Sequence, residues 1–342
     1  MGEFKPSSAE LDAEAKRLYS SLSKLGWNKE VCQAYAPLTL EINNLKKRKN
    51  AVILAHSYQP PEIVYGVADF VGDSLGLSME AARTKAKVIV FAGVRFMAET
   101  AKILSPTKKV YLPATDAGCS LAESITAADV RKLRKKHPGA GVVCYVNTDA
   151  AVKAECDACC TSANALEVVE SMPQEKVIFL PDAFMARNVA ALTKKQIIGW
   201  DGKCVVHREF SADKIRALRK AHPGMKVLVH TECAPAVVKE ADYAGGTGGM
   251  IGYAKASNAS EFVMVTECGL SDRMRVELPG KKFLAMCSLC PFMRKNSLAL
   301  IWQALAKPKK SQEIIVPKKT VARARRAIDY MMQVSSSGTG GG

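Results

Sequence analysis

The spacing of apolar residues first predicts helices. Near the start of the chain, Leu11, Leu18 and Leu22 recur at the intervals that place side chains on one face of an amphipathic helix. Less regular apolar spacing continues the pattern downstream. We therefore expect helices over residues 8–24 and 29–48.

Beyond Asn50 the texture changes to short apolar runs rich in β-branched residues. These runs predict strands over residues 51–56, 87–93, 108–114, 141–148, 176–182, 203–207, 226–230 and 261–267. Helical patterns alternate with them over 60–68, 74–86, 96–104, 125–136, 163–171, 184–191, 211–221, 234–242 and 291–306. This alternation is typical of parallel sheets with helices on both faces, so the expected fold class is α/β.

Most of the predicted strands end at a polar or small residue that is followed by a loop. Examples are His56, Asn147, His207, His230 and Glu267. In open parallel sheets, ligands bind at the carboxyl ends of the strands. The pattern therefore delivers titratable side chains to the edge where chemistry is expected.

Composition and charge narrow the function classes. The chain has 342 residues, of which 48% are hydrophobic, enough for a large core and two or three domains. Its formal net charge of +16 suits nucleic acid, an anionic membrane surface or an acidic small substrate. The basic runs 46–49, 131–136 and 307–310 lie on or beside predicted helices, where a solvated face is the simplest interpretation. Without interleaved aromatic residues, they do not predict nucleic-acid binding.

The distribution of apolar residues also bears on location. No apolar run reaches the roughly 18 residues needed to span a bilayer. The N-terminal segment carries several acidic residues and lacks the basic and apolar regions of a signal peptide. We therefore expect no membrane partner and a cytoplasmic protein.

Eleven cysteines are many for such a chain, and their spacing matches no small secreted framework. Metal or redox use is favoured over disulfides, although any single buried thiol can simply fill the core. Cys119, Cys204 and Cys290 recur at intervals of 85 and 86 residues. A unit of that length holds three or four strands with their helices, so three units would fill residues 51–306.

The local contexts of these three cysteines differ. Cys119 lies in a turn of small residues ahead of a helix, and Cys204 lies at a glycine-containing turn that enters a strand. Cys290 precedes a proline that is predicted to start a long helix. A thiol at such a helix N-terminus has a lowered pKa and favours the thiolate that metals bind.

Other cysteine groupings leave the metal open at this point. Cys287 with Cys290, and Cys156 with Cys159 or Cys160, could form a four-cysteine zinc site. The fragment around Cys290 also resembles one end of a ferredoxin motif, but the rest of that motif is missing. A basic, zinc-stabilised nucleic-acid-binding protein and an aconitase-like hydro-lyase are therefore kept as alternatives.

A series of motifs, in order, resembles the quinolinate synthase family. The matching segments are 55–78, 117–123, 144–165, 200–207, 230–238, 245–251 and 290–298. The resemblance implies three pseudo-equivalent αβα sandwich domains with parallel sheets around a central active-site cavity. It also implies one 4Fe–4S cluster with one iron open to substrate, held by Cys119, Cys204 and Cys290.

The resemblance also implies the domain boundaries. A helical extension over 1–50 precedes a first α/β domain over 51–122, which the C-terminal helices over 291–334 complete. The second domain covers 123–207 and the third covers 208–290. The low-complexity tail over 335–342 is expected to be disordered.

The resemblance also implies the roles of the polar residues. Catalytic roles fall on Glu232 as general base, on Tyr58 as proton donor, and on His230 and His56. Substrate binding is expected from His56, Ser74, Tyr145, Asn147, Ser162, His207, His230, Glu232 and Thr247. Without the resemblance, Glu232 could be a structural strand-end carboxylate, and the hydroxyls could be ordinary helix caps.

The implied reaction joins iminoaspartate to dihydroxyacetone phosphate and forms quinolinate, with loss of phosphate and two waters, in NAD biosynthesis. The open iron is the implied Lewis acid. A transient contact with an aspartate-oxidising enzyme is a further partner expectation. Two departures from the family occur: Thr231 stands where proline is common, and Leu284 replaces the first cysteine of a C-terminal trio. A redox switch built on that trio is therefore incomplete here.

Overall fold

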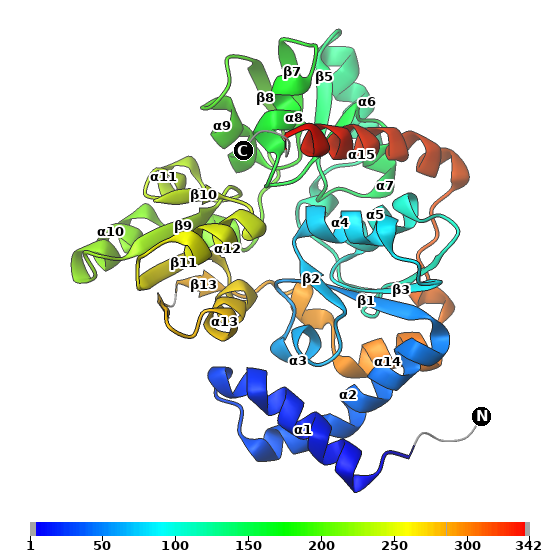
Figure 1. The fold of residues 1–342 in the computed structure, drawn as a ribbon. Helices are drawn as coiled ribbons and strands as arrows, with labels where there is room; N and C mark the ends of the chain where they lie inside the picture. The colour runs from blue at the N-terminus through cyan, green and yellow to red at the C-terminus, as the bar shows by residue number, and fades with distance from the viewer. Residues whose placement is uncertain (1–4, 285, 339–342) are drawn as a thin grey trace.

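Three parallel sheets form the body of the protein. The structure is a computed structural model that describes residues 5–284 and 286–338. The strand orders are β2-β1-β3-β4, β6-β5-β7-β8 and β10-β9-β11-β12, so all three sheets share one topology, and β13 pairs with β11. The predicted α/β class with three repeated parallel-sheet units is confirmed. Figure 1 shows the units grouped around a common centre.

The first sheet receives helices from both ends of the chain. Its strands are β1 (Ala51–His56), β2 (Phe70–Gly72), β3 (Val88–Ala92) and β4 (Lys109–Tyr111), with helices α3 (Pro61–Val64), α4 (Ser74–Arg83), α5 (Arg95–Leu104) and, late in the chain, α14 (Leu298–Ala306). Ile301 and Leu305 of α14 share a buried cluster with Ile53 and Val90 of the sheet. A helix from near the C-terminus therefore helps to complete the core of this unit.

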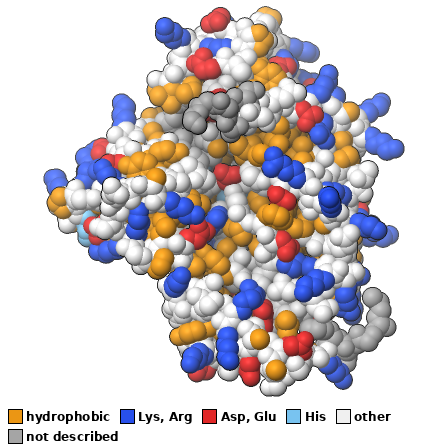
Figure 2. Space-filling view, in the orientation of Figure 1, with side chains coloured by type: hydrophobic (Ala, Val, Ile, Leu, Met, Phe, Trp, Pro, Cys, Tyr) orange, Lys and Arg blue, Asp and Glu red, His pale blue; other side chains and the backbone are white. Residues whose placement is uncertain are grey.

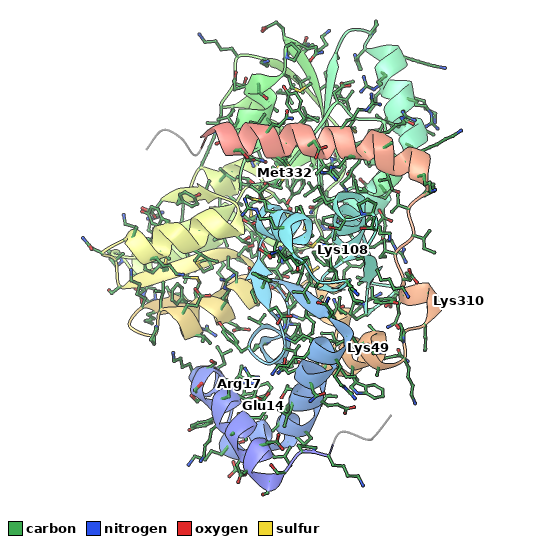
Figure 3. The ribbon with its side chains drawn as sticks, turned by 45° about the vertical axis from the view of Figure 1, so that its right-hand side comes forward. Glu14, Arg17, Lys49, Lys108, Lys310 and Met332 are labelled. Carbon is green, nitrogen blue, oxygen red and sulfur yellow. A yellow bond between two sulfur atoms is a disulfide. The ribbon has the colours of Figure 1, made fainter. Side chains whose placement is uncertain are left out.

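The second sheet carries the last helix of the chain. Its elements are β5 (Gly141–Tyr145), β6 (Ala158–Cys160), β7 (Lys176–Leu180), β8 (Gln196–Gly199), α6 (Ala127–Lys136), α7 (Ala150–Lys153), α8 (Ala165–Ser171), α9 (Ala183–Ala190) and α15 (Lys318–Gly338). Helix α15, on which Met332 is labelled in Figure 3, runs along β6 and α7. The Asn164 side-chain amide donates to Ser335 Oγ at 2.7 Å. The predicted disorder of the tail is wrong for 335–338, which are helical, while 339–342 lie outside the described residues.

The third sheet has one additional short strand. Its elements are β9 (Lys226–His230), β10 (Tyr243–Gly245), β11 (Glu261–Glu267), β12 (Lys282–Leu284), β13 (Cys287–Ser288), α10 (Ala212–Ala221), α11 (Pro235–Val238), α12 (Thr247–Ala256) and α13 (Cys268–Glu277). Cys287 forms a disulfide with Cys268. This bond joins β13 to the start of α13.

The two predicted N-terminal helices are confirmed as α1 (Ser8–Leu22) and α2 (Lys29–Lys49). Ser7 and Glu10 form a capping box at the start of α1, which satisfies free backbone N–H groups there. Glu14 and Arg17, labelled in Figure 3, form an ion pair on α1. Arg17 also donates to the backbone carbonyl of Gly66 at 2.7 Å, so the extension is tied to the first sheet unit.

Two predicted elements are wrong: one contains Cys204, and the other directly follows Cys290. Residues 203–207 form a turn that leads into a 3₁₀ turn (His207–Glu209), and the strand is Gln196–Gly199 instead. Val206 is buried as an apolar strand residue would be, which explains the error. The helix predicted over 291–306 begins only at Leu298, because the Ser297 side chain caps it by accepting from Leu300 N–H.

Each sheet also repeats one polar brace. In each sheet an aspartate directly precedes the strand that is second along the chain, and it accepts a backbone N–H from the strand that is first along the chain. The pairs are Asp69 with Ile53 at 2.7 Å, Asp157 with Val142 at 2.8 Å and Asp242 with Val227 at 2.8 Å. Each aspartate also pairs with a cation, namely Lys46, Arg134 or Arg219. The three units therefore share side-chain detail as well as strand order.

The basic runs are only partly solvated, because Lys46 of the first run is buried and donates to the Val67 carbonyl. Lys and Arg side chains are scattered over the visible face in Figure 2 and do not gather in one patch. Several pair locally, as Arg131 and Arg323 do with Glu155. Within the described residues, no helix is both long enough and apolar enough to cross a membrane.

Candidate active site and metal centre

The carboxyl ends of the three sheets meet at one cavity. Every site residue expected from the sequence lines it: His56, Tyr58, Ser74, Cys119, Tyr145, Asn147, Ser162, Cys204, His207, His230, Glu232, Thr247 and Cys290. The sequence reasoning did not single out the other lining residues, which include Asp73, Phe96, Met97, Ser120, Phe292 and Met293.

The first and third sheets deliver their side chains by the same turn. Strand β1 ends at His56, whose Nδ1 accepts the Tyr58 backbone N–H at 3.2 Å. Strand β9 ends at His230, whose Nδ1 accepts the Glu232 backbone N–H at 3.3 Å. Each turn is followed by a four-residue helix that begins with proline, a residue suited to the first helical position.

The second sheet reaches across the cavity to the third. At the end of β5, the Tyr145 hydroxyl donates to Glu232 Oε1 at 2.5 Å. Asn147 Nδ2 lies 3.4 Å from the same oxygen, while Asn147 Oδ1 is buried without a partner among the described residues. The unpartnered amide oxygen is available to a ligand in the cavity.

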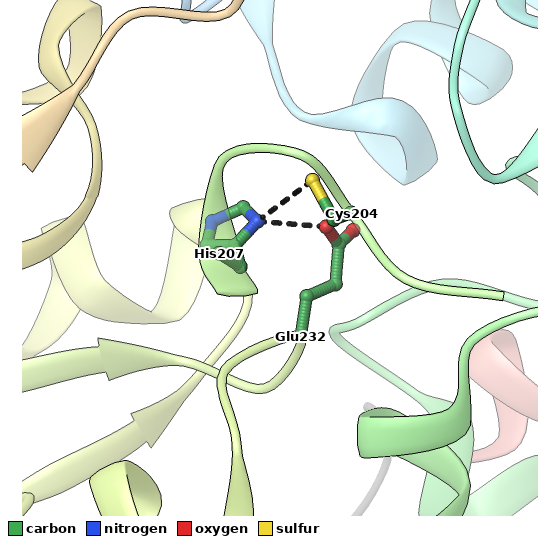
Figure 4. Close-up of side chains that lie close together, drawn as sticks. All are labelled: Cys204, His207 and Glu232. Atoms are coloured by element: carbon green, nitrogen blue, oxygen red, sulfur yellow. Dashed lines mark hydrogen bonds and ion pairs between the residues drawn. The ribbon is translucent and has the colours of Figure 1, made fainter. Parts of the chain in front are cut away.

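His207 joins Glu232 to a cysteine. Its Nδ1 lies 2.8 Å from Glu232 Oε2 and 3.3 Å from Cys204 Sγ, as Figure 4 shows. The ring stacks on His230 with centroids 4.5 Å apart. Its Nε2 lies 3.0 Å from the Thr266 hydroxyl, a residue that no motif pointed to.

Electrostatics separate these groups into one anion and several neutral donors. Burial raises the pKa of Glu232, but the neighbouring His207, His230 and Tyr145 side chains lower that pKa by a larger amount, to well below its ordinary value. Burial lowers the pKa of His56 and of His230 to about 3, so both rings are neutral near pH 7. Burial also raises the pKa of the Tyr58 and Tyr145 hydroxyls, which therefore keep their hydrogens.

The three cavity cysteines occupy equivalent turns. Each lies three residues before a 3₁₀ turn: Cys119 before Ala122–Ser124, Cys204 before His207–Glu209, and Cys290 before Met293–Lys295. In each case the backbone N–H groups two and three residues further on donate to the sulfur and lower the thiol pKa. The prediction that Cys290 precedes a long helix is wrong, and the 3₁₀ turn supplies these donors instead.

The charge balance of this set calls for a cation. Burial raises the pKa of all three thiols, that of Cys119 to about 12, and ionised Glu232 acts in the same direction. Three thiolates beside a buried carboxylate require a positively charged group. Three thiols from three units, with no fourth cysteine in the described lining, fit a 4Fe–4S cluster that keeps one iron free of protein ligands.

A second metal arrangement shares one of these thiols. Ligand atoms of Cys204, His207 and Glu232 all lie within 4.8 Å of one another. A thiolate, an imidazole and a carboxylate are a suitable donor set for a single zinc ion. Metal analysis distinguishes the two arrangements, because they differ in metal and stoichiometry.

The remaining cysteine groupings do not form the four-cysteine zinc site that was kept as an alternative. Cys287 is bonded to Cys268, so the Cys287–Cys290 pair is wrong. Cys156, Cys159 and Cys160 are buried in the second unit, where Cys159 Sγ lies 3.5 Å from Cys144 Sγ. None of these lines the cavity, and core packing accounts for their burial.

The predicted anion-binding hydroxyls come from all three units. Ser74 begins α4, Thr247 begins α12, and Ser162 lies in the turn before α8. The residues at the N-cap positions are Asp73, Gly246 and Asn164 instead, so ordinary capping does not engage these hydroxyls.

The glycines of this region permit close approach. A Cβ on Gly246 would lie 2.6 Å from Ser162 Oγ, and one on Gly248 would lie 2.7 Å from Asp73 Oδ2. At the start of α12, Gly246 therefore lets the third unit approach the second, and Gly248 lets it approach the first. Helix starts such as these present backbone N–H groups to anions.

Comparison with known proteins gives a consistent family assignment. The family described as "Quinolinate synthetase A protein" matches residues 40–333. Quinolinate synthase 1 of Mesorhizobium japonicum is 49% identical over 334 residues, which cover 98% of this chain and 100% of the relative. The quinolinate synthase of Xylella fastidiosa is 52% identical over 293 residues, 86% of each chain. That of Caulobacter vibrioides is 49% identical over 303 residues, 87% of this chain and 82% of the relative.

Proposed function

The chain belongs to the quinolinate synthetase A family, and we propose that it is a quinolinate synthase of NAD biosynthesis. Its substrates would be iminoaspartate and dihydroxyacetone phosphate, with release of phosphate and two waters. The observation that carries this proposal is the convergence of three thiols, Glu232, Tyr58 and Tyr145 on one cavity between three sheets. A cytoplasmic location and supply of iminoaspartate by an aspartate-oxidising enzyme are part of the same proposal.

In this proposal Cys119, Cys204 and Cys290 hold a 4Fe–4S cluster. When bound, such a cluster supplies a Lewis-acidic iron with an open position. The chain prepares for it by directing two backbone N–H groups at each sulfur, which stabilises the thiolate form. Glu267 also fixes the third ligand segment, because its Oε1 accepts the Cys290 N–H at 3.2 Å.

Both proposed substrates are anions, and the cavity offers neutral and partially positive groups to them. Ser74 and Thr247 stand at helix starts, where N–H groups and the helix dipole favour carboxylate or phosphate. Neutral His56 and His230, with the amide of Asn147, add hydrogen-bonding capacity without adding negative charge. These residues would bind and orient the two molecules.

Proton movement is assigned to Glu232 and Tyr58. Glu232 is ionised, so it can take a proton from a substrate carbon, and Tyr145 and His207 hold its two oxygens. Tyr58 keeps its hydrogen and can donate it to a substrate oxygen. The burial of both groups keeps bulk water away from the protons that they handle.

An anaerobic preparation tests the proposal. We expect about four irons per chain and formation of quinolinate from the two substrates, with release of phosphate. Dehydration of a hydroxydicarboxylate without quinolinate would replace the proposal with an aconitase-like activity. Colourless protein with stoichiometric zinc would favour the Cys204–His207–Glu232 arrangement.

A further inference from the structure

We propose that Thr266 is a positioning residue, whose buried hydroxyl joins Tyr58 to His207 and so couples the orientation of the Tyr58 hydroxyl to the His207 ring. The inference rests on the proposed function, and it adds a residue outside the cavity lining. Thr266 lies in β11 and has no exposed surface. It acts through its neighbours, since it does not contact the cavity itself.

The contacts of Thr266 span the three units. Its Oγ1 lies 2.8 Å from the Tyr58 hydroxyl, which comes from the loop after β1. The same oxygen lies 3.0 Å from Nε2 of His207, which comes from the turn after β8. The other nitrogen of that ring faces Glu232 Oε2 at 2.8 Å. Two hydrogen bonds and one ion-pair contact therefore connect the four side chains in series.

The direction of these bonds is limited by what each group can donate. An ionised carboxylate only accepts, so His207 Nδ1 must carry hydrogen toward Glu232. The Thr266 hydroxyl has a single hydrogen, so it can donate to Tyr58 or to His207 Nε2 but not to both. Thr266 thereby couples the orientation of the Tyr58 hydroxyl to the His207 ring.

This arrangement has a consequence for the donor step assigned to Tyr58. A substrate oxygen that takes the Tyr58 hydrogen changes the contact between the Tyr58 hydroxyl and Thr266 Oγ1. The alignment of the Tyr58 hydroxyl before that step therefore depends on the Thr266 hydroxyl. Loss of the hydroxyl should slow turnover more than it weakens substrate binding.

Two substitutions separate the hydroxyl from the shape of the side chain. Thr266→Val keeps the branched shape and removes the hydroxyl, which leaves the Tyr58 hydroxyl and His207 Nε2 without a partner. We expect kcat to fall about ten- to a hundredfold, with KM changed by less than about threefold. Thr266→Ser keeps the hydroxyl and should retain kcat within about threefold. If the valine variant does not fold, Thr266→Ala takes its place in the same comparison.

A matched control is available in helix α2. Thr39 is equally buried, its hydroxyl donates to Glu14 Oε1 at 2.6 Å, and neither residue lines the cavity. Thr39→Val removes a buried hydroxyl in the same way and should lower thermal stability without changing kcat. An equal loss of kcat in both variants would overturn the inference, because it would reflect general destabilisation.

A double substitution tests whether Thr266 acts through Tyr58. In a Tyr58→Phe background, Thr266→Val should cost clearly less kcat than it does in the wild type. Independent, multiplicative losses would instead indicate a structural role and would overturn the inference. A Thr266→Val variant that folds like wild type but loses iron would also overturn the inference. Its lower kcat would then result from an altered Cys204 site and not from Tyr58.

The wild-type protein distinguishes the inference from the function on which it rests. If wild-type enzyme with its metal makes no quinolinate, the proposed function fails before any variant is compared. If the wild type is active and Thr266→Val matches it in kcat and KM, the function stands and the inference is overturned.

Discussion

The ends of strands β1 and β9 are built alike and carry different chemistry. Both strands finish in a histidine that accepts the backbone N–H of the residue two positions on. That residue is Tyr58 in the first unit and Glu232 in the third. The same scaffold therefore presents a neutral hydroxyl on one side of the cavity and a carboxylate on the other.

The partners explain why only one end tolerates an anion. Glu232 receives Tyr145 on one oxygen and His207 on the other, so its buried charge is compensated by hydrogen bonds from outside its own unit. Among the described residues, the Tyr58 hydroxyl has one hydrogen-bond partner, the hydroxyl of Thr266. A carboxylate at that end would be buried beside Glu232 with too few donors. The repeat supplies the geometry, and the contacts between units decide the chemistry.

The largest effect should come from removing a thiol of the proposed metal centre. Alanine at Cys119, Cys204 or Cys290 should abolish iron binding and quinolinate formation, because each thiol would supply one of three protein ligands to the proposed cluster. Iron content and activity of anaerobic preparations measure this. Cys287→Ser is the control: it removes the disulfide with Cys268 and should leave the iron in place. Iron loss in Cys287→Ser with retention in Cys290→Ser would show that the C-terminal ligand is misassigned.

The next effect should come from neutralising the anionic end. Glu232→Gln keeps the shape of the side chain and removes the base, so kcat should fall by about a thousandfold while iron is retained. Steady-state kinetics beside an iron assay measure both quantities. Glu209→Gln, on an exposed neighbour of His207, should change neither. Activity within tenfold of wild type in Glu232→Gln would remove Glu232 from the mechanism.

Substitution of Tyr58, at the neutral end, should lower kcat less than substitution of Glu232. Tyr58→Phe removes the hydroxyl but no charge, and we expect kcat to fall by about a hundredfold. A loss as large as that of Glu232→Gln would mean that the two ends contribute equally and that the comparison drawn here fails. The ratio of the two losses, measured under one set of conditions, is the decisive quantity.

The shared histidines should make stability depend on pH. The pKa of His56 and His230 is about 3 in the folded protein, against 6.5 for an ordinary histidine. Below pH 6.5 the unfolded chain binds protons that the folded protein does not, so stability falls as pH falls. Each ring contributes up to about 1.4 kcal/mol per pH unit. Anaerobic urea unfolding between about pH 8 and pH 5.5 measures the free energy of unfolding at each pH. This free energy should fall less steeply with falling pH in His56→Gln than in wild type.

The smallest effect concerns the repeated aspartate brace. Asp157→Ala leaves the Val142 N–H without its acceptor and should lower the free energy of unfolding by about 1–3 kcal/mol. Asp157→Asn keeps an acceptor oxygen and should cost less. Both are measured by chemical denaturation, with activity unchanged near neutral pH. Equal losses in the two variants would assign the effect to the Arg134 ion pair instead.

The sequence predicted the longer elements well and the contacts between units poorly. Runs such as 51–56 and 226–230 matched strands because their β-branched periodicity is local. Strands of three residues, such as Phe70–Gly72, are too short to show any period. The fragment around Cys204 reads as a strand because burial, not extension, made Val206 apolar.

The site divides in the same way. Family motifs located the residues that line the cavity, but the Tyr145–Glu232 contact joins two sheets and has no signature in either segment. No motif in the sequence identifies Thr266 either. One usable signal was overlooked: each cavity cysteine is followed seven residues later by Thr126, Ser211 or Ser297, the residue before a helix. That seven-residue spacing indicates the turn that directs backbone N–H groups at the sulfur.

The position of α14 bears on the order in which the protein can be completed during synthesis. Strands β1 and β3 leave the ribosome early, yet Ile301 and Leu305, which pack against Ile53 and Val90, are made about 210–250 residues later. Helix α15, which packs on β6 and α7 of the second unit, is made later still. The third unit can therefore close its core while the first and second units still expose part of an apolar face, which makes the nascent chain depend on chaperones for cover.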